Sequence, residues 1–299
     1  MFVCPPVAIT SSMVTASNIS EDDEAAWAAG VYALGDKVMH DHSVWQSLIS
    51  SNSIEPGTDA TAWVRLSATN KFRPFDLENS AQASNPEEIT YTIKPGERIT
   101  VLGFISVDAT EITVTITTPS DGVVYTKTAE LLRVENRGTF WDWYFAPQKY
   151  LREYTFLDLP GYGEVAEAEI EITISKPGDD ARVGEIVMSH HWEMGSTLYE
   201  TEPRIRDFSV NERDAFGNAV LNKSFAVRGV TFRVAIATDD TSFVLDEFAA
   251  VTSTRVLFVG GANIDRYGTT ILGTTSEIRV PLEGPNATEV EFDVEGFIA

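Results

Sequence analysis

The feature that most constrains this fold is a strict alternation of apolar and polar residues in widely separated stretches. In 111–117, 169–175 and 289–294 every second residue is Ile, Val or Phe, and the residues between them are Glu, Asp, Thr or Ser. A period of two places the apolar residues on one face of a β-strand and the polar residues on the other. Strands with one wet face are typical of antiparallel sheets. The alternation therefore predicts antiparallel sheets packed face to face.

The turn residues between these stretches divide the chain further. Pro119-Ser120-Asp121-Gly122 and Lys176-Pro177-Gly178-Asp179 are turn sequences between strands. We predict a mainly β protein, in which a small three-stranded aromatic module precedes two antiparallel β-sandwich domains, the last with one short helix. The expected divisions are an N-terminal arm at 1–23, the module at 24–68, a β-sandwich domain at 69–196 and a β-sandwich domain with one helix at 197–299.

The arm and the helix are expected from local sequence. Pro5 and Pro6 prevent an early helix, and the arm ends in an acidic run, so we expect it to become ordered only against a partner. Asp239-Asp240-Thr241 offers N-cap chemistry for the helix. Val244, Phe248 and Val251 then fall on one helix face, which predicts that this face is buried.

Composition excludes several classes of function. The formal charge is −23, and a surface this acidic repels nucleic acid and anionic lipid. No apolar run approaches the ~20 residues of a membrane helix, so no membrane insertion is expected. The N-terminal residues do not resemble a secretory signal. The single cysteine, Cys4, excludes an internal disulfide and a Cys-rich zinc site.

Four aromatic residues mark the module, and their candidate role is glycan binding: Trp27, Tyr32, Trp45 and Trp63. Their order, with Gly35-Asp36 and Val38 between them, resembles the chitin- and cellulose-binding modules of carbohydrate-binding families five and twelve. The resemblance implies a platform of rings that stack on sugars. Those modules carry an adjacent aromatic pair where this chain has Ser47 to Asn52. The alternative is that the rings fill the core of a small docking or spacer domain.

A second resemblance spans nearly the whole chain. The order of its features is similar to that of a family of tailed-bacteriophage tail proteins. The matching segments, in chain order, are Asn70 to Asp76, Trp141 to Pro147, Leu157 to Tyr162, Val183 to Val187, Arg206 to Ser209, Glu212 to Asn218 and Val294 to Phe297.

This resemblance implies a virion structural protein of the tail tip or baseplate, assembled in the host cytoplasm. The implied partners are other virion tail proteins and further copies of the chain, in a homo-oligomer. A host cell-surface polysaccharide is a further partner if the module binds glycans. In this interpretation residues 197–299 form the tail-assembly domain. The alternative is a carbohydrate-binding accessory protein of a cell surface or secreted system.

Aromatic and arginine residues provide the candidate assembly contacts. Trp141, Trp143, Tyr144 and Phe145 are expected on one strand, which is either buried on both faces or half-buried with an aromatic contact surface. Arginines near aromatic residues are expected at domain junctions or in contacts with neighbouring virion chains. These candidates are Arg73, Phe75, Arg204, Arg206, Arg213 and Phe216.

No catalytic or metal site is expected. His40-Asp41-His42 and His190-His191 have the chemistry of metal ligands, but an i, i+2 pair on a strand needs a third ligand from elsewhere. The chain has no acidic motif of the chitinase type, no Ser-His-Asp order and no Gly-rich phosphate loop. We therefore expect a non-enzyme without a cofactor.

Overall fold

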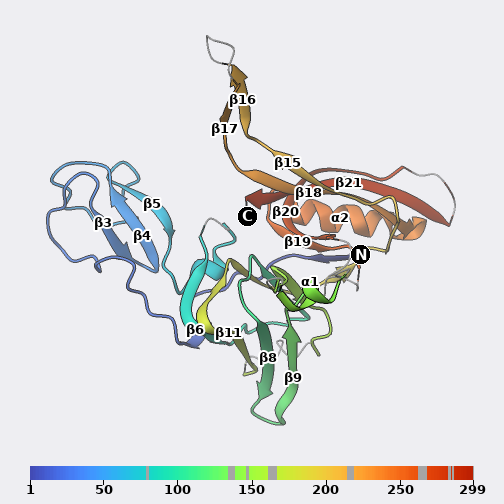
Figure 1. Cartoon of the computed structure of the whole chain (residues 1–299), viewed down its shortest axis with the longest axis horizontal. Coiled ribbons are helices and arrows are strands. Elements are labelled where there is room, and N and C mark those ends of the chain that lie inside the picture. Colours follow the sequence, from blue (N-terminus) through green and yellow to red (C-terminus); the bar gives the residue numbers. More distant parts are fainter. Residues whose placement is uncertain are drawn as a thin grey trace.

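A computed structural model describes residues 1–78, 81–133, 139–145, 148–160, 167–213, 219–261, 268–281, 284 and 286–298. The chain forms a central body of stacked sheets from which three parts project (Figure 1). The module lies to one side, a long hairpin rises from the body, and the turn between two strands of the middle domain extends from the opposite side. The fold is mainly antiparallel β, as the alternation predicts.

The middle domain is a sandwich of two antiparallel sheets. The larger has the order β2-β6-β11-β8-β9, and the smaller has the order β10-β7-β12. Alternate residues of the larger sheet, including Ile112, Val114 and Ile172, are fully buried against Phe104 and Phe156 of the smaller. The strands are β2 (Val14–Ser17), β6 (Ala83–Ile93), β7 (Val101–Ile105), β8 (Glu111–Thr118), β9 (Gly122–Glu130), β10 (Glu153–Phe156), β11 (Glu169–Val183) and β12 (Glu185–Ser189).

The C-terminal domain is built on an eight-stranded sheet with helix α2 (Thr241–Val251) on one face. Its order is β13-β1-β19-β20-β21-β18-β14, and β15 also pairs with β18. The strands are β1 (Phe2–Cys4), β13 (Trp192–Glu193), β14 (Ser196–Thr197), β15 (Glu202–Asp207), β18 (Ala226–Ala237), β19 (Val256–Val259), β20 (Thr270–Arg279) and β21 (Ala287–Ile298).

Helix α2 confirms the prediction from its sequence. The turn η3 (Thr238–Asp240) leads into it, and the helix buries Val244, Phe248 and Val251 against the sheet. Asp240 occupies the N-cap position, but its side chain makes no capping hydrogen bond.

The two domains share a packed interface. The free face of the smaller sheet packs through Val101 and Val187 against Leu257, Val259 and Leu272 of the eight-stranded sheet. A Cβ on Gly103 would overlap the Leu257 side chain, so glycine permits this close approach. The body thus has four layers: the five-stranded sheet, the three-stranded sheet, the eight-stranded sheet and α2.

The N-terminal segment is not the free arm expected from its sequence. Strand β1 lies between β13 and β19, with Phe2 paired to Glu193 and to Val259. Further along, β2 pairs with β6 at the edge of the five-stranded sheet. The prolines do exclude a helix, but they follow β1 and leave its hydrogen bonds intact. Two sheets of this same chain therefore order the segment.

The module folds as the expected three-stranded unit. Its strands are β3 (Lys37–His40), β4 (Ser43–Ser47) and β5 (Trp63–Ala68), in the order β3-β4-β5. Asp41 and His42, both with positive φ, form the turn between β3 and β4. The short 3₁₀ helix η1 (Arg73–Phe75) follows the module and leads into the middle domain.

The aromatic segment is not the strand expected from its sequence. Residues Phe140–Phe145 form the short helix α1. Its rings pair at helical spacing: Phe140 stacks on Tyr144, and Trp141 stacks on Phe145. Contacts four residues apart favour a helical turn over an extended chain here.

A long hairpin continues from the eight-stranded sheet. Strands β15 and β18 form its stem, and β16 (Val210–Arg213) and β17 (Ala219–Asn222) form a separate two-stranded ribbon beyond it. Figure 1 shows this ribbon rising well clear of the body.

Candidate interaction surfaces

The four aromatic candidates of the module differ in their exposure. Trp63 is 1% exposed, and its indole nitrogen donates to the Ile54 carbonyl at 2.7 Å. Trp27, Tyr32 and Trp45 are half-buried and pack around it and its neighbours. Tyr32 meets Trp63 edge-on at 5.5 Å. Trp63 is therefore a core residue, and the other three rings offer partial faces rather than one flat platform.

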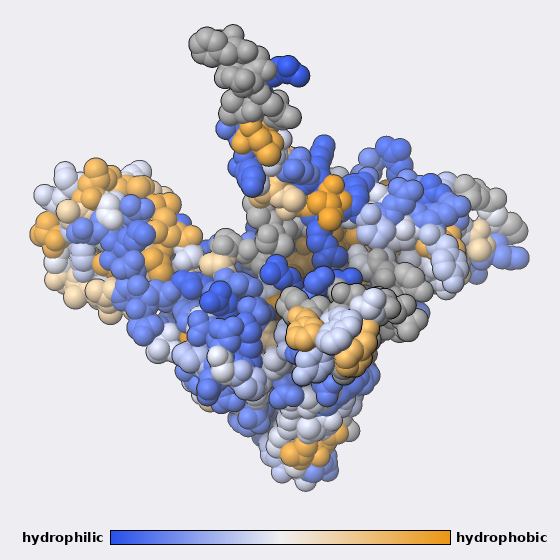
Figure 2. Space-filling model, viewed as in Figure 1, coloured by the Kyte–Doolittle hydropathy of each residue, from blue (hydrophilic) through white to orange (hydrophobic). Residues whose placement is uncertain are grey.

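The exposed apolar residues of the module are aliphatic. Figure 2 shows hydrophobic colour around its rim. The residues at least 38% exposed are Val31, Leu34, Leu48, Ile49, Val64 and Leu66. Aliphatic side chains have no π-face for a sugar ring, whereas they suit a contact with another protein.

Arg73 and Phe75 lie inside the chain. The Arg73 guanidinium pairs with Asp23, and Phe75 meets the buried Tyr91 edge-on at 5.2 Å. Asp23 also accepts a hydrogen bond from the Asn70 amide at 2.8 Å. These two candidates therefore occupy the junction of the arm, the module and the middle domain.

The other assembly candidates belong to the long hairpin. Arg204 donates to Thr231 and to Asp293, each at 2.9 Å, and Arg206 lies over the Phe208 ring at 5.4 Å and 3.8 Å from Glu295. Arg213 ends β16, opposite Ala219. Phe216 lies outside the described residues. The stem thus holds its arginines against the acidic face of β21, while their side chains stay at least 49% exposed.

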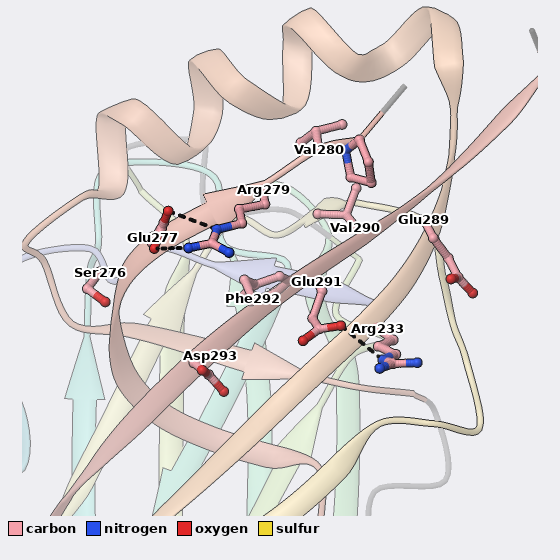
Figure 3. Close-up of a pocket in the computed structure, with 11 residues that line it drawn as sticks. Arg233, Ser276, Glu277, Arg279, Val280, Glu289, Val290, Glu291, Phe292 and Asp293 are labelled. Carbon is pink, nitrogen blue, oxygen red and sulfur yellow. Dashed lines mark hydrogen bonds and ion pairs between the residues drawn. The ribbon is translucent and has the colours of Figure 1, made fainter. Parts of the chain in front are cut away.

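A cavity of about 760 Å³ lies beside β20 and β21 (Figure 3). Both of its arginines are paired with carboxylates of the lining: Arg233 with Glu291 at 3.1 Å, and Arg279 with Glu277 at 2.9 Å. The Arg279 guanidinium holds the pKa of Glu277 below its usual range. A carboxylate held ionised by arginine is a poor general acid, and this cavity has the character of a solvated, charge-paired surface.

The histidines serve structural contacts. His42 pairs with Glu21 at 3.0 Å, and His191 lies 2.7 Å from the Thr100 hydroxyl. Within the described residues, no group of three or more His, Cys, Asp or Glu side chains is placed to hold a metal ion. No helix in this part of the chain is long and apolar enough to span a membrane.

A second groove was missed from the sequence. It has a volume of about 680 Å³ and lies where the middle domain meets the hairpin stem. We call it the basic groove, because Arg133, Lys149, Arg152 and Arg228 line it. A count of charge along the chain would have indicated part of it, since Arg133, Arg137, Lys149 and Arg152 fall within 20 residues of a strongly acidic sequence.

Comparison with known proteins adds no relative. The chain matches no protein-family model, no curated protein and no solved structure. Its function is therefore inferred from its own residues and geometry.

Proposed function

We propose that this chain is a structural protein of a bacteriophage tail, at the tail tip or baseplate, and that it holds neighbouring protein chains through its projecting parts. It acts by binding and has no catalytic role. The resemblance across the chain supports the setting, and the projecting hairpin supports the role. The hairpin is the observation that carries the proposal.

The ribbon β16–β17 has few means of stabilising itself. Its described apolar residues are exposed, Val210 by 50% and Leu221 by 56%. Val210 pairs with Asn222 and Leu221 with Asn211, so the two apolar side chains lie on opposite faces. An isolated two-stranded hairpin is marginal in water, and its unpaired strand edges template pairing with another chain. Such a ribbon suits insertion between neighbouring subunits.

The hydrogen bonds where the ribbon joins the stem allow the ribbon to be removed without opening the stem. The Ser224 amide donates to the Ser209 hydroxyl at 3.0 Å, and Phe208 pairs with Phe225 just below. An Asn-Gly turn can therefore replace residues 210–223 and leave the stem closed. The truncated protein should melt at the wild-type temperature but fail to enter tail particles. The double variant Val210→Ser, Leu221→Ser is the milder form of the same test.

A matched control removes exposed apolar residues elsewhere. Val31→Ser with Leu34→Ser changes two exposed side chains of the module and leaves the hairpin intact. Truncated protein that enters particles at wild-type occupancy would refute the proposal. If the control variant fails to enter particles and the truncated protein enters them, the module and not the hairpin makes the required contact.

Host-polysaccharide attachment by the module is the lesser candidate. It relies on Trp27, Tyr32 and Trp45, whose rings are half-buried. Pull-down of wild-type protein on chitin, cellulose and host-wall polysaccharide, set beside Trp45→Ala, tests it. Retention that Trp45→Ala abolishes without lowering the melting temperature would support a sugar site.

A further inference from the structure

Strand β20 has a strand on both sides only in its first half. The pairing of β19 with β20 ends at Val256 and Gly273, whereas β21 pairs with β20 as far as Arg279. From Thr274 to Arg279, the edge of β20 that faces away from β21 pairs with no strand among the residues that the structure describes. A free strand edge presents N–H and C=O groups to which an incoming strand can bond.

A β-bulge lies within this free stretch of β20. The register with β21 shifts between Thr275 and Ile278, so that Ser276 and Glu277 lie opposite a single residue of β21. A bulge disrupts the ladder locally and leaves one residue without a ladder partner. Both bulged residues are exposed, and Figure 3 shows them on β20 below the helix. The second half of β20 therefore has unpaired backbone groups that are open to solvent.

Helix α2 faces this free edge across a groove of about 220 Å³, which we call the α2–β20 groove. On the helix side, the exposed residues Leu245, Ala249 and Thr252 line it at positions i, i+4 and i+7. The helix thus has a second stripe beside the stripe that it buries against the sheet. The complete lining is Leu245, Phe248, Ala249, Thr252 and Thr275 to Ile278.

The α2–β20 groove has the features of a site for an added β-strand. Main-chain hydrogen bonds to a free sheet edge give such a strand its affinity, and its alternate side chains enter the adjacent pocket. Phe248 and Ile278 supply apolar surface for one of these side chains, and Glu277 is the one charged residue of the lining. The volume is below the roughly 300–1,000 Å³ of small-molecule sites, so a side chain suits this groove better than a free ligand.

We infer that the α2–β20 groove receives strand β17 of a second copy of this chain. One edge of β17 pairs with β16, and its other edge pairs with no strand among the described residues. Leu221 of β17, which is 56% exposed, is an apolar side chain of the kind that the groove accepts. The exposed Lys223 follows β17, and carboxylates lie on both sides of the groove, Asp246 on α2 and Glu277 on β20.

The two strands also match in length. Strand β17 has four residues, and the free stretch of β20 runs from Thr274 to Arg279. The ribbon of the same chain rises away from α2 (Figure 1), so the occupant comes from another copy. This inference rests on the proposed function, because it supplies the surface on which the projecting ribbon docks.

The contact joins different surfaces of the two copies. Each copy offers its ribbon to the groove of the next, and its own groove receives the ribbon of a third copy. Such a head-to-tail contact builds a ring when the rotation closes and an open filament when it does not.

Filling the groove tests the site. Ala249→Arg places a long side chain in the groove from an exposed position, so it should weaken self-association by about tenfold or more and leave the melting temperature unchanged. Ala250→Arg makes the same change at an exposed position outside the lining and should have a much smaller effect. Sedimentation velocity measures both variants. Equal weakening by the two variants, or wild type that stays monomeric at its highest soluble concentration, would overturn the inference.

Mixing two defective variants tests the occupant. The ribbon-truncated protein keeps its groove, and the Ala249→Arg protein keeps its ribbon. Each should be monomeric alone, and their mixture should form a dimer with one copy of each, because only one ribbon and one groove can meet. Adding Leu221→Ser to the Ala249→Arg protein should abolish this dimer, whereas adding Val123→Ser, at another exposed position, should not. A mixture that stays monomeric would overturn the inference.

Incorporation into tail particles separates this inference from the proposed function. If Ala249→Arg enters particles at wild-type occupancy and the truncated protein does not, the ribbon docks on another surface, which overturns the inference and leaves the proposed function standing. Truncated protein that enters particles at wild-type occupancy would refute the proposed function, whatever the mixture of variants does.

Discussion

Two neighbouring stretches of the chain, the N-terminal segment 1–23 and the module 24–68, fold by opposite means. The segment contributes Val3 to one core and Cys4 to another, because alternate residues of β1 face opposite sides of the eight-stranded sheet. Burial raises the pKa of the Cys4 thiol to about 12. Its strands have no hydrophobic core of their own, and residues far along the chain supply all their partners.

The module, in contrast, completes its own structure. Val38, Ala62 and Trp63 form its core, and Asn52 donates to Ser47 and to the Ala62 carbonyl within it. Its contacts to the body lie at the junction, where Arg65 pairs with Glu78 at 2.9 Å and Ala68, at the end of β5, joins the core of the middle domain. The comparison shows that backbone pairing, rather than length or position in the sequence, decides whether a segment belongs to the body.

The largest expected effect is in the N-terminal segment. Val3→Asp places a carboxylate at a side chain that is 0% exposed, between β13 and β19. A buried, unpaired charge should cost upwards of about 4 kcal/mol and disrupt the C-terminal sheet. Thermal unfolding of Val3→Asp beside the exposed Ala8→Asp measures this effect. Equal melting temperatures of the two variants would show that the N-terminal segment does not belong to the core.

A smaller and local effect is expected in the module. Trp63→Ala removes the largest side chain of its core, at a cost of about 3–5 kcal/mol. Because the module shares little core with the body, amide exchange should rise across 24–68 and stay unchanged in β8 and β11. Leu66→Ser, at an exposed position of β5, is the control. Loss of protection throughout the chain would show that the two parts fold together.

A pH-dependent effect is expected where the N-terminal strand meets His191. Phe2 meets this imidazole edge-on at 5.1 Å, and burial, aided by His190, lowers the pKa of His191 below its usual 6.5. The folded state therefore favours the neutral ring. The contribution of the neutral His191 ring to the stability of the fold is complete above about pH 6.5 and is lost as the pH falls through the folded-state pKa of His191.

The measurement compares the free energy of unfolding at about pH 8 and about pH 5. Wild type should lose more stability over this range than His191→Gln, which does not titrate. Identical losses would show that His191 does not link the segment to acid stability.

The smallest effect is expected from removing the module. Asp23 bonds to Asn70 across the base of the module, so a Gly-Ser linker can join residues 23 and 69. The shortened protein should melt within a few degrees of wild type, because the sheets of the middle and C-terminal domains and the N-terminal segment are intact. A fall in melting temperature as large as that of Val3→Asp would show that the module, like the N-terminal segment, is needed for the stability of the body.

Local sequence patterns predicted two kinds of element: those whose partners lie close in sequence, and those in which the apolar spacing repeats over enough residues to be recognised. The alternation in β8, β11 and β21 gave one-sided strands, and the apolar spacing in α2 identified its buried face. The same reasoning failed at Trp141 to Phe145, because adjacent aromatic residues fit a strand as well as a helix. The sequence marked Arg73 and Phe75 as candidate assembly contacts, but their position inside the chain depended on Asp23 and Tyr91.

The sequence by itself determined that the chain is acidic, mainly β and built from antiparallel strands, because charge and side-chain period depend on residues a few positions apart. Tertiary structure decided the rest. Three residues, Phe2–Cys4, carry too short a pattern to reveal a strand, and their partners lie near the other end of the chain. The basic groove likewise joins residues from Val107 to Gly268, which only the packing of two domains brings together. Strand pairing and charge clustering are properties of distance in space, and sequence spacing does not encode them.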